Sequence, residues 1–299
     1  MDLGFSFLLA ACYRTAYLLH HRLCLRPGQP LQHARLIVAG AYRTGGAGKT
    51  PFCIWLAEQF AVQGKRVAIL CHRYAYDEAE LLKRKFADSP QVKVFKTGNR
   101  YRTAHEIDKA REFDIILCDD GFEDSRLIAT TTFILSWETP PTSIQDLWPL
   151  GNAKSLAQDH TTRPVVQVRC TGENPDIRFA IDKITSLSGT PVAATEYYRQ
   201  MHIFCGLGDP KRFCEDLKKT GIRISATTFL KDHDRKFIQK LKRAMGKSPD
   251  EIFLISEKDA ARLKSPEFIG KDSPDASFAQ RIYVAHQKTT VRAGLVDLI

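Results

Sequence analysis

A glycine-rich loop between a predicted strand and a predicted helix constrains this chain more than any other feature. The apolar run 36–40 is typical of a buried strand, the segment AYRTGGAGKT follows at 41–50, and an amphipathic helix continues beyond it. Glycines allow backbone N–H groups to close around phosphate oxygens, and the N-terminus of the helix adds positive potential. The sequence therefore predicts a phosphate-binding loop formed by Thr44, Gly45, Gly46, Ala47, Gly48, Lys49, Thr50 and Pro51.

The last two residues of this loop carry its side-chain chemistry. Lys49 can bridge phosphate oxygens, and the hydroxyl of Thr50 can ligate Mg²⁺. The strict motif has glycine five residues before Gly48, where this chain has Arg43. A glycine turn followed by a chance Lys-Thr pair is the alternative, but the strand, loop and helix occur in the order that a phosphate site needs. We therefore expect the loop to bind the β- and γ-phosphates of a nucleotide.

A second predicted strand ends in two carboxylates. The run 113–118 is apolar, and Asp119 and Asp120 follow it directly. A fold with a phosphate-binding loop places its Mg²⁺-holding acid at the end of such a strand, beside the loop. A turn or a helix cap is the alternative role for these acids. We expect Thr50, Asp119 and Asp120 to hold Mg²⁺.

Strand-like and helix-like segments alternate between the two motifs. Strands are predicted at 67–70 and 92–95, and helices at 77–86 and 100–111. This alternation predicts an α/β fold with a doubly wound, mostly parallel sheet that binds ligands at the carboxyl ends of its strands. Several side chains just past such strand ends, or at the start of the next helix, are placed to meet a second substrate. They are His72, Arg73, Tyr74, Asp77, Glu78 and Arg100.

The rest of the chain indicates a second, smaller α/β domain. The segment 139–162 is rich in turn residues and poor in apolar periodicity, so we place the crossing between the domains there or just after it. Strands are predicted beyond it at 165–168, 202–205 and 252–256, alternating with helices at 210–219 and 234–245. The predicted division is an N-terminal interfacial helix and linker at 1–30, a phosphate-binding domain at 31–162 and a smaller domain at 163–299.

The N-terminal segment 5–20 is apolar and aromatic, although Arg14 interrupts it. Helical spacing places apolar side chains on one face and positive charge at the far end, as in helices that lie in a membrane interface. The face holds Phe5, Leu8, Leu9, Cys12 and Ala16, and the charge comes from His20, His21, Arg22 and Arg26. A terminal helix packed on its own domain is the alternative. The sequence has no uninterrupted run of about 18 apolar residues, so it predicts no membrane-spanning helix.

The charge of the chain indicates the kind of partner it binds, and its cysteines bear on whether it binds zinc. With 44 Lys+Arg against 34 Asp+Glu, the formal net charge is +10, which favours anionic partners such as nucleotides, acidic lipid surfaces or nucleic acid. We find no aromatic and basic single-strand platform and no helix-turn-helix signature, so we expect no nucleic-acid partner. The eight cysteines form no C-x-x-C pair, which disfavours a zinc site.

Five motifs follow one another along the chain. They are GAYRTGGAGKTP at 40–51, DDGF at 119–122, FCGLGDP at 204–210, DH at 232–233 and SEKDA at 256–260. In this order the chain resembles the tetraacyldisaccharide 4′-kinases, the membrane-associated P-loop kinases of lipid A biosynthesis. The loop of that family also has the distal glycine, here Gly40, and lacks the usual first glycine, so Arg43 becomes a point of similarity. The resemblance extends to about Val284.

The resemblance implies transfer of the γ-phosphate of ATP to the 4′-hydroxyl of a lipid disaccharide 1-phosphate, with ATP and Mg²⁺ as cofactors. It also implies peripheral attachment to the cytoplasmic face of the inner membrane in a Gram-negative-type bacterium. An anionic amphiphilic substrate fits both the basic composition and an interfacial N-terminal helix. The membrane surface and this lipid are therefore the expected partners.

The resemblance further implies roles for single residues. Asp77 corresponds to the family's catalytic base and His233 to the histidine that supports it, while Lys49 acts on the transferred phosphate. The residues expected to meet the lipid substrate are Arg73, Tyr74, Glu78, Arg100 and Glu123. On local grounds alone, Asp77 and Glu78 can instead be first-turn acids that favour a helix dipole, His233 a capping residue and Arg100 a surface arginine.

Three departures from the family pattern leave alternatives open. The segment 72–76 runs straight into Asp77 and lacks the family's longer connection. Within this segment, His72 or Arg73 replaces the family arginine. Glu123 stands at a family glutamine, and PLGNAKS at 149–155 lacks the family's Arg-Glu pair. One alternative is a degenerate member that binds nucleotide or lipid without transferring phosphate. The other is a membrane-associated switch or partitioning ATPase, whose signature lysine would stand at position 44.

Overall fold

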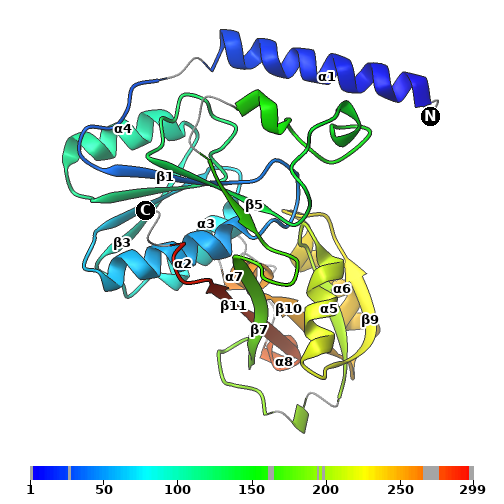
Figure 1. The fold of residues 1–299 in the computed structure, drawn as a ribbon. Coiled ribbons are helices and arrows are strands. Elements are labelled where there is room, and N and C mark those ends of the chain that lie inside the picture. The colour runs from blue at the N-terminus through cyan, green and yellow to red at the C-terminus, as the bar shows by residue number, and fades with distance from the viewer. Residues whose placement is uncertain are drawn as a thin grey trace. The chain divides into compact units, whose positions relative to one another are not determined.

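The computed structural model describes residues 3–25, 28–160, 165–193, 195–196, 199–264 and 276–295. The chain forms two compact units, which we call the first unit and the second unit. The first unit holds residues 1–74, 86–178 and 290–299, and the second holds residues 75–85 and 179–289. Figure 1 shows the order of the elements along the chain. The second unit thus takes one short segment from the middle of the first.

A six-stranded sheet forms the centre of the first unit. Its strand order is β3-β2-β4-β1-β5-β6, and every neighbouring pair is parallel. The strands are β1 (Arg35–Gly40), β2 (Val67–His72), β3 (Val92–Thr97), β4 (Ile115–Asp119), β5 (Thr131–Ser136) and β6 (Val165–Arg169). The central strands are nearly continuous apolar runs because both faces of the sheet are covered. The predicted α/β fold with a mostly parallel sheet is confirmed.

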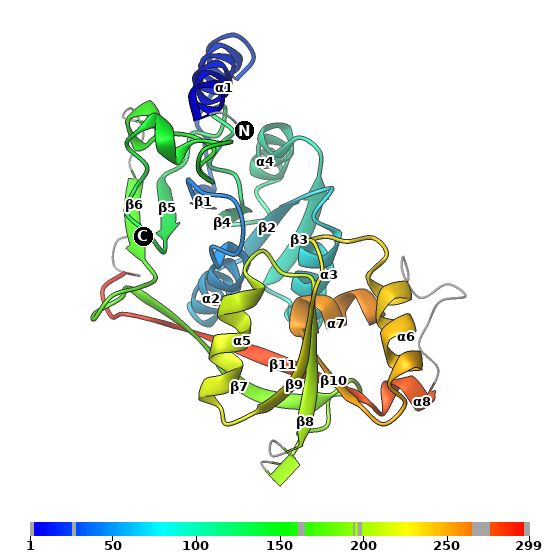
Figure 2. The ribbon, with the colours of Figure 1, turned by 90° about the vertical axis from the view of Figure 1, so that its right-hand side faces the viewer.

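Helices cover both faces of this sheet. The helices of the first unit are α1 (Leu3–Leu23), α2 (Lys49–Val62) and α4 (Arg100–Ala110), with short 3₁₀ turns η1 (Ile144–Asp146) and η2 (Ala157–His160). Figure 2 shows α2 and α4 on opposite faces. Phe52 of α2 packs edge-on against Phe133 of β5, whereas Ile107 of α4 belongs to the core cluster on the other face. Asn99 caps α4 by accepting a hydrogen bond from the backbone N–H of Arg102.

Strand β6 is the edge strand of the first sheet, where it pairs with β5. We predicted residues 165–168 as part of the second domain, because the turn-rich segment 139–162 is typical of a domain crossing. The described part of that segment instead folds within the first unit, around η1 and η2. The apolar pattern of a short strand does not say which sheet it joins. The domain boundary at residue 162 itself stays a prediction.

Helix α1 has one face on the protein and one in solvent. The buried and partly buried residues of its inner face include Ala10, Tyr13, Arg14, Tyr17 and His21. The opposite face, which we call the outer stripe, consists of the exposed residues Phe5, Leu8, Cys12, Ala16, Leu19 and Leu23. This stripe contains four of the five apolar residues that helical spacing grouped on one face. Among the described residues, no helix has the length and apolar character needed to cross a membrane.

The second unit contains a five-stranded sheet with the order β7-β11-β10-β8-β9, in which β10 pairs in parallel with β8 and β11, and β8 with β9. Its strands are β7 (Ile177–Ser186), β8 (Gln200–Cys205), β9 (Arg223–Phe229), β10 (Ile252–Ser256) and β11 (Ile282–Val291). Its helices are α3 (Tyr76–Lys85), α5 (Pro210–Lys219), α6 (Phe237–Lys247), α7 (Glu257–Lys264) and α8 (Ala276–Ala279). Phe204, Phe237 and Phe253 are buried at the centre of one core cluster. Helix α3 packs against α7.

Candidate active site

The phosphate-binding loop connects β1 to α2 in the first unit. Gly45, Gly46 and Gly48 have φ angles of 85°, 31° and 87°, in the left-handed region that side chains disfavour. Gly48 is the N-cap of α2, so the backbone N–H groups of the first helical turn lie at the end of the loop. The indole N–H of Trp137 donates to the carbonyl oxygen of Ala47 at 3.2 Å. The loop therefore has the backbone conformation that a phosphate site requires.

Arg43, which stands at the missing first glycine, ties the loop to a later segment of the chain. Its guanidinium donates to Oδ1 of Asn152 at 2.8 Å, and it pairs with Asp146 at 2.9 Å and with Glu138 at 3.2 Å. The backbone N–H of Thr44 donates to the carbonyl oxygen of Asn152 at 2.9 Å. Sequence reasoning missed these partners, because Asn152 follows Arg43 by 109 residues. The arginine thus anchors the loop.

Thr50 and the two predicted acids meet at the start of α2 and the end of β4. The hydroxyl of Thr50 donates to Oδ2 of Asp119 at 2.8 Å, and Asp119 is buried. The Nζ of Lys49 lies 3.5 Å from Oδ1 of Asp120. A hydroxyl and two carboxylates are the hard oxygen ligands that Mg²⁺ prefers. The three residues fit a Mg²⁺ ion, and their role as its ligands stays a prediction.

Positive charge surrounds Asp120. Besides Lys49, the Nζ of Lys154 lies 3.6 Å from Oδ1 of Asp120. Burial raises the pKa of Asp120, but the charges of Lys49, Lys154 and Arg100 outweigh burial and lower this pKa below its ordinary value. Asp120 is therefore ionised near neutral pH. The sequence does not single out Lys154, because the segment 149–155 is distinguished only by the Arg-Glu pair that it lacks.

Two further predicted arginines lie at the carboxyl ends of the first sheet. Arg100 donates to the carbonyl oxygen of Asp119 at 3.0 Å. Arg73 donates to the hydroxyl of Tyr74 at 2.8 Å, and Tyr74 is exposed. Burial, followed by the charges of Arg100 and Arg73, lowers the pKa of His72. This end of the sheet concentrates positive charge, which favours an anionic ligand.

Glu123 contacts other parts of the first unit with both of its carboxylate oxygens. The hydroxyl of Tyr17, on α1, donates to Oε2 at 2.5 Å, and the hydroxyl of Ser155 donates to Oε1 at 3.2 Å. Burial raises the pKa of Glu123, although the hydrogen bond from Tyr17 opposes this shift. The expected contact of Glu123 with the lipid substrate stays a prediction, and the structure shows a second role for it beside α1.

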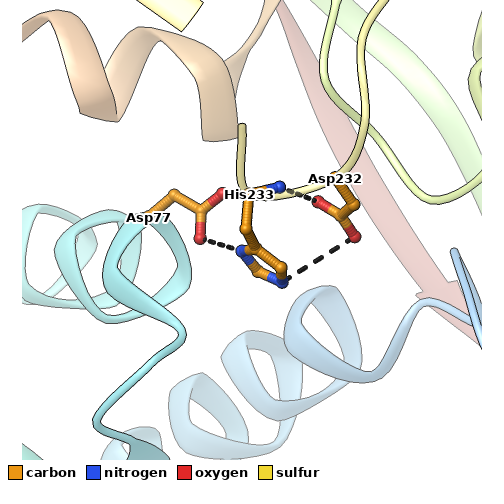
Figure 3. A group of neighbouring side chains, drawn as sticks. All are labelled: Asp77, Asp232 and His233. Carbon is orange, nitrogen blue, oxygen red and sulfur yellow. Dashed lines mark hydrogen bonds and ion pairs between the residues drawn. The ribbon is translucent and has the colours of Figure 1, made fainter. Parts of the chain in front are cut away.

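The predicted base and its supporting histidine lie side by side in the second unit. Asp77, in the first turn of α3, is 2% exposed. The Nδ1 atom of His233 lies 2.6 Å from Oδ1 of Asp77, although 156 residues separate the two along the chain. Figure 3 shows this pair together with Asp232, whose Oδ1 accepts the backbone N–H of His233 at 3.0 Å. The fold therefore brings together the two residues that the family resemblance paired.

Positive side chains hold the other oxygen of Asp77. The Nε atom of Arg262 donates to Oδ2 of Asp77 at 3.1 Å and its Nη2 donates to the same oxygen. The Nζ of Lys258 lies 3.6 Å from this oxygen. Burial raises the pKa of Asp77, but the hydrogen bond from His233 and the charges of Lys258 and Arg262 outweigh burial and hold this pKa far below its ordinary value. The hydrogen bond to Asp77 raises the pKa of His233.

The same lysine connects the remaining acids of this cluster. The Nζ of Lys258 lies 3.2 Å from Oε1 of Glu78 and 2.8 Å from Oδ1 of Asp232. Asp77, Asp232 and His233 each offer a ligand atom within 4.8 Å of one another, but the ammonium group of Lys258 already balances the acids, so we assign no metal here. Glu78, predicted to meet the substrate, thus belongs to a group that we call the Asp77 cluster. Its members are Asp77, Glu78, Asp232, His233, Lys258 and Arg262.

These geometries define a class of protein. A phosphate-binding loop, a neighbouring pair of acids and a parallel sheet are the parts of a nucleotide-dependent phosphoryl-transfer enzyme. The sequence matches the profile of the family described as tetraacyldisaccharide-1-P 4′-kinase over residues 3–298. The chain belongs to this family.

Individual relatives agree with this assignment. The tetraacyldisaccharide 4′-kinase of Chlamydia trachomatis is 24% identical over 262 residues, which cover 75% of this chain and 69% of that protein. The enzyme of Stutzerimonas stutzeri is 27% identical over 263 residues, 77% of this chain and 74% of that protein. The fold is similar to that of LpxK from Aquifex aeolicus, crystallised in complex with ATP, with a TM-score of 0.65 and 19% identity, covering 99% of this chain and 96% of that one.

The family assignment confirms the predicted class of reaction. The chain is an ATP-dependent kinase of lipid A biosynthesis that transfers phosphate to a hydroxyl group, with ATP and Mg²⁺ as its cofactors. The switch ATPase and the non-catalytic member, the two alternatives left open by the sequence, have less support. The roles of single residues do not follow from the family assignment and are proposed below.

Proposed function

We propose that this chain phosphorylates the 4′-hydroxyl of a tetraacyldisaccharide 1-phosphate with the residues described above. The observation that carries the proposal is that the phosphate-binding loop lies beside the two acids. The hydroxyl of Thr50 lies 2.8 Å from Oδ2 of Asp119, and the Nζ of Lys49 lies 3.5 Å from Oδ1 of Asp120. This arrangement supports the loop as the site of the ATP phosphates and the acids as the holders of Mg²⁺. A Mg²⁺ ion bound there would neutralise charge on the phosphates during transfer.

The Asp77–His233 pair takes up the proton of the acceptor in this proposal. The hydroxyl oxygen of the lipid attacks the γ-phosphorus of ATP, the bond from phosphorus to the bridging oxygen of ADP breaks, and ADP leaves. The hydroxyl proton passes to the pair, since a positioned base assists such a step. Both residues lie in the second unit, 2.6 Å apart.

Within the pair, the contacts favour His233 as the proton acceptor and Asp77 as the residue that orients it. Both oxygens of Asp77 are engaged, by His233 and Arg262, and its low pKa makes it a weak base. The side chain of His233 is 40% exposed and its pKa is raised. When Nδ1 donates to Asp77, Nε2 is the acceptor of the neutral ring. These roles are exchanged relative to the expectation from the family resemblance.

Attachment to the cytoplasmic face of the inner membrane completes the proposal. The outer stripe of α1 supports it, because Phe5, Leu8, Leu19 and Leu23 are each between 52% and 63% exposed. A helix with such a face and with basic residues in its last turn favours the interface of an anionic bilayer. Flotation with acidic lipid vesicles measures this attachment, and unchanged flotation after Leu8→Asp would contradict it.

Transfer of radiolabelled γ-phosphate from Mg²⁺-ATP to the lipid disaccharide 1-phosphate in detergent micelles tests the function. We expect label in the lipid, and a rate on the order of 10²- to 10³-fold lower for Lys49→Ala, since a preorganised charge at the transferred phosphate is lost. Lys65→Ala, which removes an exposed lysine, is the matched control and keeps the rate. A protein that binds ATP without labelling the lipid contradicts the proposal and favours the non-catalytic alternative.

A further inference from the structure

Helix α1 is fixed to the first unit by polar contacts, although most of its residues are apolar. The hydroxyl of Tyr13 donates to the carbonyl oxygen of Lys154 at 2.8 Å. Arg14 pairs with the buried carboxylate of Asp159 at 2.9 Å. The hydroxyl of Tyr17 donates to Glu123 at 2.5 Å. Directed hydrogen bonds fix one position of a helix, which apolar contact alone does not.

The contact of Tyr17 leads directly to the acids of the nucleotide site. Glu123 is separated from Asp120 only by Gly121 and Phe122. This turn is closely packed, because a Cβ atom on Gly121 would lie 2.4 Å from the sulfur of Cys118, and Phe122 is 1% exposed. A displacement of Glu123 therefore moves Asp120, since close-packed interiors transmit strain.

The contact of Tyr13 leads to the same carboxylate from the other side. Lys154, whose carbonyl oxygen accepts the Tyr13 hydrogen bond, donates its backbone N–H to the carbonyl oxygen of Tyr42 at 2.8 Å. Its Nζ lies 3.6 Å from Oδ1 of Asp120. Lys154 is thus held between α1 and the residue that precedes Arg43 of the loop. Both contacts of the helix therefore lead to Asp120, since Glu123 follows Asp120 by three residues and Lys154 pairs with it.

A buried network completes the enclosure of Glu123. The hydroxyl of Ser155, which is fully buried, donates to Glu123 at 3.2 Å and lies 2.9 Å from Nε2 of His160. The hydroxyl of Tyr17 lies 3.3 Å from the same histidine nitrogen. When a partly buried carboxylate loses one donor, its desolvation is no longer compensated, and this favours movement of the carboxylate. Tyr17 therefore contributes to the position of Glu123.

We propose that α1 positions the nucleotide site, with Tyr17 and Tyr13 as positioning residues that act through Glu123 and Lys154 on Asp120. The seated helix holds Asp120 and the ammonium group of Lys154 where Mg²⁺-ATP requires them. Coupling between two sites is reciprocal, so Mg²⁺-ATP also stabilises the seated helix. The inference rests on the proposed function only in taking ATP and Mg²⁺ as the ligands of the loop.

Tyr17→Phe tests this coupling, because it removes one hydroxyl and keeps the ring. Thr15→Val is the matched control on the same helix, since the hydroxyl of Thr15 is exposed and donates to the carbonyl oxygen of Ala11. The dissociation constant of ATP is measured by calorimetry at several Mg²⁺ concentrations, without the lipid acceptor. We expect Mg²⁺-dependent ATP binding on the order of tenfold weaker for Tyr17→Phe, which is within the usual size of a coupling between two sites, and no change for Thr15→Val.

Two more measurements separate coupling from a general loss of structure. Glu123→Ala combined with Tyr17→Phe is expected to weaken binding no further than Glu123→Ala alone, because both changes act on one path. Hydrogen exchange in α1 is expected to slow when Mg²⁺-ATP binds to the unchanged protein, and not in Tyr17→Phe. Tyr13→Phe repeats the test if Tyr17→Phe unfolds.

Equal ATP affinities of Tyr17→Phe and Thr15→Val at every Mg²⁺ concentration would overturn the inference. A rate of hydrogen exchange in α1 of the unchanged protein that stays the same when Mg²⁺-ATP binds would also overturn it. The proposed function fails in a different way, by binding Mg²⁺-ATP without labelling the lipid, and the coupling is still measured in that case.

Discussion

The phosphate-binding loop and the Asp77 cluster are built in opposite ways. The loop is one contiguous segment, and its shape depends on the left-handed backbone of Gly45, Gly46 and Gly48. The cluster takes side chains from α3, from the residues before α6 and from α7, and ion pairs hold these together. A local backbone conformation leaves a local signature in the sequence. A cluster assembled by the fold leaves only scattered residues.

The two sites also hold their carboxylates differently. The side chain of Asp120 is 39% exposed and lies 3.5 Å from Lys49 and 3.6 Å from Lys154. The side chain of Asp77 is 3% exposed, and His233 lies 2.6 Å from it. Longer, partly exposed ion pairs contribute little stability and can exchange partners, whereas a buried pair cannot be broken cheaply. The ion pairs of Asp120 can therefore exchange partners when Mg²⁺-ATP binds, while those of the Asp77 cluster are fixed before substrate arrives.

Arg262→Met should produce the largest effect that bears on this contrast. The change leaves Asp77 buried and without the guanidinium that donates two hydrogen bonds to its Oδ2. We expect the free energy of unfolding to fall by about 3–5 kcal/mol, because a buried charge loses its partner. Urea denaturation followed by circular dichroism measures this loss. Arg262→Lys, which keeps the charge, should restore part of it.

Arg199→Met is the matched control for Arg262→Met in the second unit. Arg199 is exposed and pairs with Glu196 at 2.9 Å, so its loss should cost at most about 1 kcal/mol. Equal losses of unfolding free energy in the two variants would show that burial of the Asp77 pair adds nothing to its strength. The contrast between the two sites would then disappear.

Local patterns predicted the strands better than their assembly. The apolar run 252–256 was predicted and found as β10, and the segment 210–219 was predicted and found as α5, since burial and helix capping act on neighbouring residues. The run 165–168 was predicted as a strand but placed in the second domain, whereas β6 pairs with β5. Pairing depends on contacts between distant segments, which a short pattern does not encode.

In the candidate site, too, local motifs were predicted from the sequence and contacts between distant residues were not. The pairs Lys49–Asp120 and Thr50–Asp119 join two motifs that sequence reasoning identified. Arg262 was missed, because a basic residue four positions after Lys258 on a helix is typical of a solvated face. The sequence does not predict the partner of Tyr17 either, since the tyrosine lies in an apolar helix and Glu123 follows it by 106 residues.

The pH dependence of the rate should show an intermediate effect and sharpen the roles within the Asp77 cluster. His233 must be neutral to accept a proton, so kcat/KM should rise about tenfold per pH unit until the pH passes the raised pKa of His233. Asp77 stays ionised throughout, because its pKa is held far below its ordinary value. The rate profile between about pH 5 and 9 measures this rise. His233→Gln should lower the rate and flatten the profile.

The same two groups stabilise the fold in different pH ranges. The stabilisation from His233 is complete below its ordinary pKa of 6.5 and is lost as the pH rises through its raised pKa. The stabilisation from Asp77 is present above its ordinary pKa of 3.8 and is lost as the pH falls through its lowered pKa. A rate that is constant across the neutral range while His233→Gln keeps activity would instead make Asp77 the base.

Arg43→Gly should give the smallest effect and tests whether the loop is as local as its motif. The change restores the glycine of the strict motif but removes the contacts of Arg43 with Asn152, Asp146 and Glu138. We expect the free energy of unfolding to fall by about 1 kcal/mol, because these contacts are partly exposed and glycine adds backbone freedom. We also expect ATP binding, measured by calorimetry, to weaken a few-fold, since the loop loses its anchor to the segment after η1.

Arg43→Met and Arg102→Met separate the causes of this effect. Arg43→Met removes the contacts without adding glycine, so it should weaken ATP binding as much as Arg43→Gly does. Arg102 is exposed and pairs with Glu106, and its replacement should leave ATP binding unchanged. If Arg43→Gly binds ATP as tightly as the unchanged protein, the glycines alone shape the loop and the contacts of Arg43 are incidental. If it binds more weakly, even the most local feature of this chain depends on a partner 109 residues away.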